Sequence, residues 1–369
     1  MPTATPPASA QHQFPCAQCG ANLQFEPGTD SLKCPYCGTE QKIPTVPEHI
    51  PRLDFLAFVH ELPATDGVAE TLTVHCTNCG AETGLQPNVT AALCPFCGGG
   101  IVATASSKKV IRPQGLLPFK ITREQASEKF RQWVASLWFA PSALKKQAEQ
   151  SAIHGVYVPA WTYDSNTFTQ YTGERGENYW ETETYTETDA QGNQVTRTRQ
   201  VQKIRWWPVS GRVSNRFVDL IVMATLTLPR KHLDRLQPWD LPALVPYADE
   251  YLSGFVAESY QVPLAEGFET AKGLMQPVIN STICRDIGGD HQRIHSANTD
   301  YRDIMFKHLL MPVWISAYQF QNKAYRFLVN ARTGHVQGER PWSAAKILIL
   351  IGIILAIVGI IATIAAMNK

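Results

Sequence analysis

The sequence predicts a multidomain α+β protein. It would combine two small ribbons built on four cysteines each, a mixed domain rich in antiparallel β-sheet with helices, and one C-terminal transmembrane helix. Three observations support this fold class. Eight of the nine cysteines fall into two identical frames, a strand-like region with a charged hairpin follows a helical pattern, and an uninterrupted apolar run lies near the C-terminus. A length of 369 residues suits several domains.

These features set the expected domain boundaries. We expect 1–13 to be a disordered tail, 14–44 the first ribbon, 45–70 a linker, 71–104 the second ribbon, 105–118 a basic linker, 119–341 the α+β domain and 342–369 the anchor. The net charge is +1, from 33 Lys and Arg against 32 Asp and Glu. Such a balance excludes a chain-wide field that would capture nucleic acid or an anionic membrane.

The cysteines carry the clearest chemistry. Both frames read C-x2-C-x14-C-x2-C, and the second begins 60 positions after the first, which indicates an internal duplication. Two residues between cysteines let one tight turn aim both sulfurs at a single ion, and the Gly after each pair permits a close backbone turn. Two such turns complete the closed four-thiolate site that is typical of structural zinc. We therefore predict two Zn²⁺ ions, one on Cys16, Cys19, Cys34 and Cys37 and one on Cys76, Cys79, Cys94 and Cys97.

Disulfides and a rubredoxin-like iron site are the alternatives to zinc. No secretory signal precedes the frames, and a reducing compartment favours thiolate and metal over disulfide. The C-P-x-C-G turns resemble the second knuckle of rubredoxin, although rubredoxin sets its knuckles much farther apart in the sequence. The ninth cysteine, Cys284, lies in an apolar helical stretch, which favours a buried thiol over a nucleophile.

The C-terminal apolar run predicts a membrane anchor. Residues 347–367 contain no charged side chain, and 21 residues make a helix of about 31 Å, which matches the hydrocarbon core of a bilayer. Lys346 and Arg340 precede the run, whereas only Asn368 and Lys369 follow it. With no N-terminal signal, this asymmetry predicts a single-pass, tail-anchored protein of the inner membrane, with the bulk of the chain in the cytoplasm.

Small residues recur along one face of this predicted span. Such a stripe lets two helices approach closely and predicts a homo-oligomer, although Gly and Ala are also common in membrane spans generally. The residues are Gly352, Ala356, Gly359, Thr363 and Ala366.

A helix is predicted to open the α+β domain. Thr122 can cap it, and Gln125 can reach back to complete a capping box. Apolar residues at helical spacing predict one buried face, made of Ala126, Phe130, Trp133, Val134, Leu137 and Trp138. Pro141 would end this helix and open a second one over 142–150.

Strand-like residues follow, with a charged hairpin over 179–205. Acidic residues stand at odd positions before its turn and basic residues at odd positions after it: Glu181, Glu183, Glu187, then Arg197, Arg199, Lys203 and Arg205. A register centred on Gly192 pairs Glu187 with Arg197 and predicts a loop of odd length. Because both faces are polar, we expect the hairpin to project from the core.

A second strand region is predicted after a helix over 264–287, and a short motif links the two regions. Tyr157-Val158-Pro159-Ala160-Trp161 is echoed by Leu310-Met311-Pro312-Val313-Trp314, which marks either two related halves or a coincidence. His291 and His295 have the spacing of a helical metal site, but the preceding Gly288-Gly289 favours a strand that would separate them.

The segment 108–146 is the one basic region of the sequence. Between 108 and 149, nine Lys and Arg residues face three Glu residues. A solvated helix surface, contact with anionic lipid headgroups and contact with nucleic acid are the three interpretations. The ribbons themselves lack the clustered cations that phosphate binding needs, since the first has a net charge of −1 and the second contains only Glu82 as a charged residue.

Three stretches also carry a family resemblance. They are 121–148 (ITREQASEKFRQWVASLWFAPSALKKQA), 155–176 (GVYVPAWTYDSNTFTQYTGERG) and 309–346 (LLMPVWISAYQFQNKAYRFLVNARTGHVQGERPWSAAK). With the paired CPxCG ribbons, the chain resembles a family of bacterial membrane-anchored twin zinc-ribbon proteins of uncertain function. Its members are often labelled primosomal protein N-prime (replication factor Y) or superfamily II helicase-like. The resemblance implies a shared architecture and brings no catalytic residues.

The helicase label can be tested on the residues. ATP-driven translocation needs a G-x-x-x-x-G-K-[ST] phosphate loop, and the sequence contains no Gly-Lys-Ser or Gly-Lys-Thr. We expect no ATPase activity. The leading hypothesis is a non-enzymatic, tail-anchored zinc-ribbon scaffold or adaptor that docks protein partners at the cytoplasmic face of the inner membrane. One alternative is a membrane-tethered, replication-associated nucleic-acid-binding module that uses 108–146. Another is an enzyme whose site is scattered across the β-rich domain.

Overall fold

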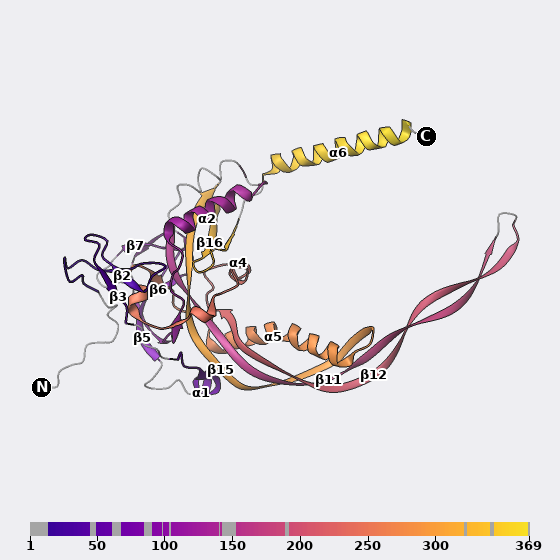
Figure 1. The fold of residues 1–369 in the computed structure, drawn as a ribbon, viewed down its shortest axis with the longest axis horizontal. Helices are drawn as coiled ribbons and strands as arrows, with labels where there is room; N and C mark the ends of the chain where they lie inside the picture. Colours follow the sequence, from indigo (N-terminus) through magenta and orange to yellow (C-terminus); the bar gives the residue numbers. More distant parts are fainter. Residues whose placement is uncertain are drawn as a thin grey trace.

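A computed structural model describes the chain in eleven segments. These are residues 14–44, 49–60, 68–84, 91–97, 99–102, 105–139, 141, 153–188, 192–320, 323–339 and 343–367. The predicted tail over 1–13 and the predicted second helix over 142–150 lie outside these segments. The described part is a mixed α/β structure dominated by one large sheet, with small cysteine-rich sheets at one end and a helix extending away from the body (Figure 1).

Three long antiparallel strands form the spine of the protein. They are β11 (His154–Thr188), β12 (Gln194–Met223) and β15 (His291–Phe320), in the spatial order β12-β11-β15. Shorter strands extend the sheet beside them: β4 (Leu53–Asp54), β10 (Gly115–Leu116), β13 (Val245–Pro246), β14 (Val256–Ala257), β16 (Lys323–Asn330) and β17 (Val336–Gly338). The core follows the inner parts of the long strands, where β11 is buried on both faces.

The two echoed motifs meet at the centre of this sheet. Tyr157 lies opposite Pro312 and Pro159 opposite Leu310, so each motif pairs antiparallel with the other. A helix precedes each motif strand, α2 (Arg123–Ser136) before β11 and α5 (Leu264–Ile287) before β15. Each motif strand also pairs with the strand that follows it, β12 or β16. The arrangement favours two related halves over a coincidence.

Helix α5 packs along β11 and β12 and confirms the predicted helix over 264–287 (Figure 1). Its start is held by two buried aromatic side chains of β11. The indole Nε1 of Trp161 donates to the carbonyl oxygen of Val262 at 2.9 Å, and the Tyr163 hydroxyl donates to that of Leu264 at 2.7 Å. Gly267 permits this approach, because an added Cβ would stand 2.4 Å from the Tyr163 oxygen.

Helix α2 begins as predicted but does not bury every apolar residue. Its capping box is present, with the Gln125 N–H donating to the Thr122 hydroxyl and the Thr122 N–H donating to the Gln125 side chain. The predicted face is buried except at Trp133, which is half-buried, and Trp138, which is 79% exposed. The prediction was wrong at Trp138 because the helix ends at Ser136, so residues beyond it leave the helical spacing.

The charged hairpin projects from the body, as predicted (Figure 1). Its five-residue loop between Thr188 and Gln194 has the predicted odd length, but the register differs by two residues. Glu187 faces Val195 rather than Arg197. The prediction placed Gly192 at the centre of the loop, whereas its φ of +87° suits the left-handed position near the end of a turn.

The predicted charge pairs nevertheless form across the diagonal of the ladder. The Nε of Arg197 lies 3.2 Å from a Glu187 oxygen, and the Nζ of Lys203 lies 2.7 Å from a Glu181 oxygen. Long side chains can reach the diagonal neighbour on the same face as well as the residue directly opposite. Charge alone therefore could not select between the two registers.

The segments expected as linkers contain ordered elements. In the first, β4 pairs with β15, and α1 (Phe55–His60) follows it and buries Phe55 in the α5 core. In the second, β9 (Ala105–Ile111) pairs with β5 (Val68–His75), and β10 runs parallel to β15. Apolar residues such as Ile111 and Leu116 lie among the charged ones and are buried. The remaining short helices are α4 (Arg230–Asp234), η1 (Leu241–Ala243) and η2 (Asp249–Leu252).

Helix α6 (Ala344–Met367) closes the described chain and extends away from the rest of it (Figure 1). Its window Lys346–Thr363 has a mean hydropathy of 2.8, and no residue of this window is buried in the body. By length and composition it is the one helix among the described residues that could cross a membrane. This helix contains all residues of the predicted small-residue stripe: Gly352, Ala356, Gly359, Thr363 and Ala366.

Candidate metal centres

The four cysteine pairs adopt one recurring turn. In each, the N–H of the first cysteine donates to the carbonyl oxygen five residues later, at 2.7 to 2.9 Å: Cys16 to Ala21, Cys34 to Thr39, Cys76 to Ala81 and Cys94 to Gly99. Gly20, Gly38 and Gly80 have φ between +73° and +77°, the conformation for which these positions require glycine. The turns aim both sulfurs of each pair inward.

Small hairpins bring the turns together in pairs. The first ribbon is a three-stranded sheet of β1 (Gln24–Phe25), β2 (Ser31–Lys33) and β3 (Glu40–Lys42). The second combines β5, β6 (Glu82–Gly84), β7 (Ala91–Leu93) and β8 (Gly100–Val102). The structure thereby assembles the eight predicted cysteines into two separate groups of four, each with its sulfurs within 4.8 Å of one another.

The sulfur separations fit a tetrahedral metal site. They are 3.5 Å for Cys16–Cys37 and 3.4 Å for Cys19–Cys34 in the first group, and 3.7 Å for Cys76–Cys97 and 3.6 Å for Cys79–Cys94 in the second. A Zn–S bond of about 2.3 Å gives a tetrahedral S–S edge of about 3.8 Å. A disulfide requires about 2.05 Å. The described cysteines are all free, so both groups can hold a metal ion.

The ionisation of the thiols in each four-cysteine group favours a bound cation. Backbone N–H groups of Cys19 and Gln18 lower the pKa of the Cys16 thiol. Burial would raise the pKa of Cys97, but the Gly99 N–H and the Asn78 amide hold it at about 7. Burial raises the pKa of Cys94 far above its ordinary value. Four sulfurs this close cannot all ionise unaided, whereas a divalent ion stabilises every thiolate together.

The first ribbon packs on one face of the large sheet. Leu23, Phe25 and Leu32 share a core with Tyr157 and Trp314. The ring of Phe25 lies edge-on to Tyr251 with centroids 5.1 Å apart. Backbone hydrogen bonds join the two parts, including one from the Gly28 N–H to the Phe119 carbonyl oxygen at 2.9 Å. This ribbon is therefore part of the folded body rather than a free module.

The second ribbon packs on the opposite face of the same strands. Phe96 and Ala81 share a core with Val156, Val158 and Met311. Because successive residues of a strand point to opposite faces, Val156 and Val158 face away from Tyr157. Side-chain and backbone bonds add to this contact: the Gln261 amide donates to the Gly80 carbonyl oxygen at 2.7 Å, and the Ser259 N–H donates to that of Glu82 at 3.0 Å. The two duplicated ribbons thus pack on opposite faces of the centre of the sheet.

A buried carboxyl group lies at the edge of the second ribbon, and the sequence analysis did not identify it. Glu258 is 3% exposed and accepts hydrogen bonds from the hydroxyls of Thr225, at 2.8 Å, and Thr227. Its second oxygen has no hydrogen-bond partner among the described residues. Burial, with a smaller contribution from Glu82, raises the pKa of Glu258 to about 7. No local sequence pattern signals this site, because its partners come from a different part of the chain.

Glu258 is expected to make stability fall as pH rises. Its folded pKa exceeds its unfolded one, so between about pH 4.5 and 7 the native state holds a proton that the unfolded state has lost. Stability therefore falls across this range and levels off above the folded pKa. From pH 6 to 8 the wild type should lose about 1 kcal/mol more unfolding free energy than Glu258→Gln. Denaturant titration of both proteins at the two pH values measures this. Equal pH dependence of the two proteins would contradict the raised pKa of Glu258. Titration of the cysteines contributes equally to both proteins and therefore cancels in the comparison.

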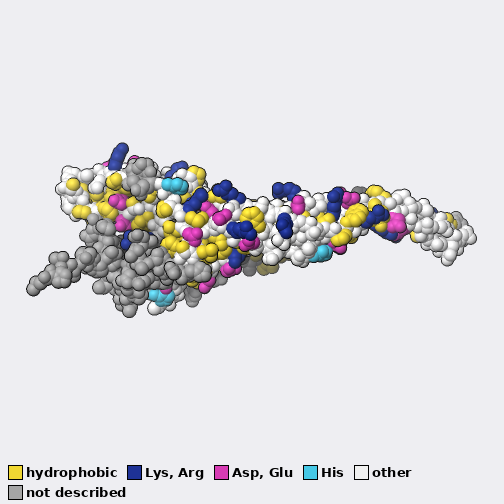
Figure 2. All heavy atoms as spheres, turned by 90° about the horizontal axis from the view of Figure 1, so that it is seen from below, with side chains coloured by type: hydrophobic (Ala, Val, Ile, Leu, Met, Phe, Trp, Pro, Cys, Tyr) yellow, Lys and Arg dark blue, Asp and Glu magenta, His cyan; other side chains and the backbone are white. Residues whose placement is uncertain are grey.

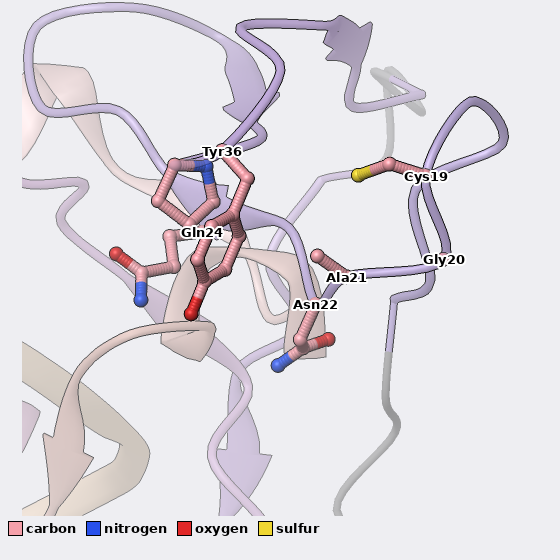
Figure 3. A pocket seen from close by; sticks show the side chains of 7 residues that line it. Cys19, Gly20, Ala21, Asn22, Gln24 and Tyr36 are labelled. Atoms are coloured by element: carbon pink, nitrogen blue, oxygen red, sulfur yellow. The ribbon is translucent and has the colours of Figure 1, made fainter.

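A shallow pocket opens on the outer surface of the first ribbon (Figure 3). Its walls come from both cysteine turns and from β1: Cys19, Gly20, Ala21, Asn22, Gln24, Pro35 and Tyr36. Tyr36 is 83% exposed at its rim. The only titratable side chains in the lining are Cys19 and Tyr36, and Cys19 belongs to the first four-cysteine group. The pocket is therefore the solvent-facing side of the first four-cysteine group.

The other candidate residues are spread over separate elements. His291 and His295 lie on strand β15, as the preceding glycines favoured, and contact Asn178 and Glu174 rather than each other. Cys284 is half-buried on α5, so it is less buried than predicted. In the part of the chain that the structure describes, no third group of metal-ligating side chains forms.

The predicted basic region does not form one continuous element. Its described cations are spread over three places: strand β9 holds Lys108 and Lys109, helix α2 holds Arg123, Lys129 and Arg131, and Arg112 and Lys120 lie outside both elements. On α2, Arg131 pairs with Glu128 at 2.9 Å. Lys145 and Lys146 lie outside the described residues.

Comparison with known proteins adds a relative that matches along most of its length but no function. No protein-family model matches the chain. The chain is similar to "Uncharacterized protein YdjG" of Bacillus subtilis (strain 168), with 25% identity over 335 residues, covering 90% of this chain and 91% of that protein. The similarity therefore extends well beyond the cysteine frames. The resemblance to the twin zinc-ribbon family stays a prediction, and the chain is similar along most of its length to a bacterial protein whose name states no activity.

Proposed function

We propose that this protein is a non-enzymatic, tail-anchored scaffold that holds protein partners at the cytoplasmic face of the inner membrane. The observation that carries the proposal is α6, whose apolar window contains no residue that is buried in the body. An apolar helix of this length has a bilayer as its natural solvent. Lys346 before the apolar run supports a cytoplasmic location for the body.

Zinc is the ion we propose for both four-cysteine groups. Four thiolates at tetrahedral spacing form a closed set that leaves no position for a substrate or a reactive water, which is the pattern of structural zinc. Each ribbon also contributes core residues to the large sheet. Zinc would thus stabilise the body that presents the partner surfaces.

The projecting arm of β11 and β12 supports an adaptor role. Its outer part carries the exposed Trp180 and several ion pairs between its two strands. Acidic and basic side chains are interspersed along it rather than forming a field of one sign (Figure 2). Glu183 contacts both Arg199, at 3.2 Å, and Lys203, at 3.0 Å. Locally neutralised cations suit protein contacts better than a phosphate backbone, which requires unpaired clusters.

The test combines membrane fractionation with cross-linking in the cells that produce the protein. The full chain should sediment with membranes, and protease added to inside-out vesicles, but not to intact spheroplasts, should digest its body. Cross-linked protein partners should co-purify with the full chain. A variant lacking 344–369 should become soluble and lose these partners, because the bilayer concentrates both.

Two controls separate anchoring from partner binding. A variant with α6 replaced by an unrelated membrane helix should keep the partners if α6 serves only as an anchor. Recovery of no protein above background would contradict the scaffold. Salt-sensitive recovery of DNA or RNA, lost on neutralising Lys108, Lys109, Lys145 and Lys146, would instead support the nucleic-acid alternative. Self-association through the small-residue face of α6 stays a prediction, which the oligomeric state of the anchored variants would report.

A further inference from the structure

The end of helix α2 is tied to the beginning of helix α6. The Ser343 N–H, one residue before α6, donates to the Phe139 carbonyl oxygen at 2.8 Å. The Nζ of Lys346, in the first turn of α6, donates to the Trp138 carbonyl oxygen at 3.1 Å. Figure 1 shows α2 running toward the point where α6 leaves the body. A cation at the C-terminal end of a helix also interacts favourably with its unpaired carbonyl groups.

Trp138 is exposed at this junction, although Phe130, Val134 and Leu137 of the same predicted face are buried. Phe130 and Val134 of α2 lie in the core, where the Phe130 ring stacks on Phe327 of β16. Trp138 follows the end of the helix and is 79% exposed. An indole ring in that position places a large apolar surface in contact with whatever surrounds the base of α6.

The position of Trp138 relative to the start of the apolar run of α6 indicates what surrounds its ring. Its carbonyl oxygen contacts Lys346, and the uncharged apolar run begins at the next residue, Ile347. The membrane boundary of an anchored chain lies where such a run begins. Tryptophan is enriched at this depth, because its ring is apolar and its N–H can bond to headgroups or water. A lysine there can extend its ammonium toward the headgroups.

We propose that Trp138 inserts into the headgroup region of the bilayer and, together with Lys346, holds α2 and the body against the membrane. The partner is the lipid surface that surrounds α6. This inference rests on the proposed membrane anchor and adds a second contact to it. The orientation of the body is then set by the junction of α2 and α6 rather than by the anchor alone.

Quenching of tryptophan emission by brominated lipids tests the inference. The experiment uses the full chain with Trp342→Phe, which removes the tryptophan four positions before Lys346 in the sequence. This protein is reconstituted in phosphatidylcholine vesicles with or without brominated acyl chains. The measured quantity is the tryptophan emission that is lost when the acyl chains are brominated. Adding Trp138→Phe should reduce this loss about twofold or more, because a ring at the interface lies nearest the quencher. Trp180→Phe is the matched control. Trp180 is 66% exposed but lies on the projecting arm, so its removal should leave the quenched emission unchanged.

Vesicle flotation separates failure of this inference from failure of the anchor. A chain that floats with vesicles and is quenched equally with and without Trp138 would overturn the interface contact and leave the anchor intact. A chain that does not float would overturn both. Because Trp138 is largely exposed, its replacement by phenylalanine does not threaten folding.

Discussion

Cys94→Ser should lower the bound zinc from two ions per chain to one. Three remaining thiolates cannot complete the second tetrahedral site, and a serine hydroxyl is a poor replacement for a thiolate. The loss should also destabilise the body strongly, because Cys94 is buried in the same core as Phe96, Leu117 and Val158. Structural zinc contributes about 10 kcal/mol or more of folding free energy in zinc-finger peptides. Metal analysis of the purified chain and denaturant titration measure the two effects.

Cys284→Ser provides the matched control for this prediction. Cys284 is the ninth cysteine, lies on α5 and belongs to neither four-cysteine group. Its replacement should leave both ions in place and shift stability only slightly. Retention of two zinc ions by Cys94→Ser would refute the four-thiolate assignment for the second ribbon. Iron in the parent protein would refute zinc while leaving the ligand set intact.

Trp161→Ala should cost about 3–5 kcal/mol of unfolding free energy, the usual range for removing a fully buried large aromatic ring. The Trp161 ring is completely buried, with centroids 4.9 Å from Tyr260, 6.0 Å from Phe306 and 4.7 Å from His308. The substitution also removes the indole donor from the Val262 carbonyl oxygen. Both losses weaken the contact between β11 and the start of α5.

Denaturant titration of the full chain in detergent would measure this change. Trp180→Ala is the matched control, because it makes the same substitution at a tryptophan that lies on the projecting arm and is 66% exposed. It should change stability by less than about 0.5 kcal/mol. Similar losses from the two substitutions would contradict the assignment of the core to the inner parts of β11 and β15.

The metal groups were predictable from the sequence because their geometry is local. Each C-x2-C pair shares one turn, and Gly20, Gly38 and Gly80 supply the left-handed backbone conformation that follows three of these turns. The beginning of α2 was predictable for the same reason, since Thr122 and Gln125 bond within a single helical turn. Neither feature needs the rest of the protein to define it.

The exposed position of Trp138 and the register of the hairpin were not predictable in this way. A helical pattern does not state where the helix ends, and Trp138 lies just past that end. For the hairpin, side chains as long as Arg197 and Glu187 can meet directly or diagonally, so their charges are compatible with both registers. In both cases several backbone arrangements share the same local pattern.

The sequence by itself determined the two four-cysteine groups, the helical start of the α+β domain and the apolar helix near the C-terminus, because short-range spacing and composition encode each of them. Only the tertiary structure decided that the ribbons pack on opposite faces of one sheet, that Glu258 is buried between distant segments, and that the end of α2 meets the base of α6. These features depend on contacts between residues far apart in the chain. Burial and hydrogen bonding across such distances follow from the packed fold, and no local pattern records them.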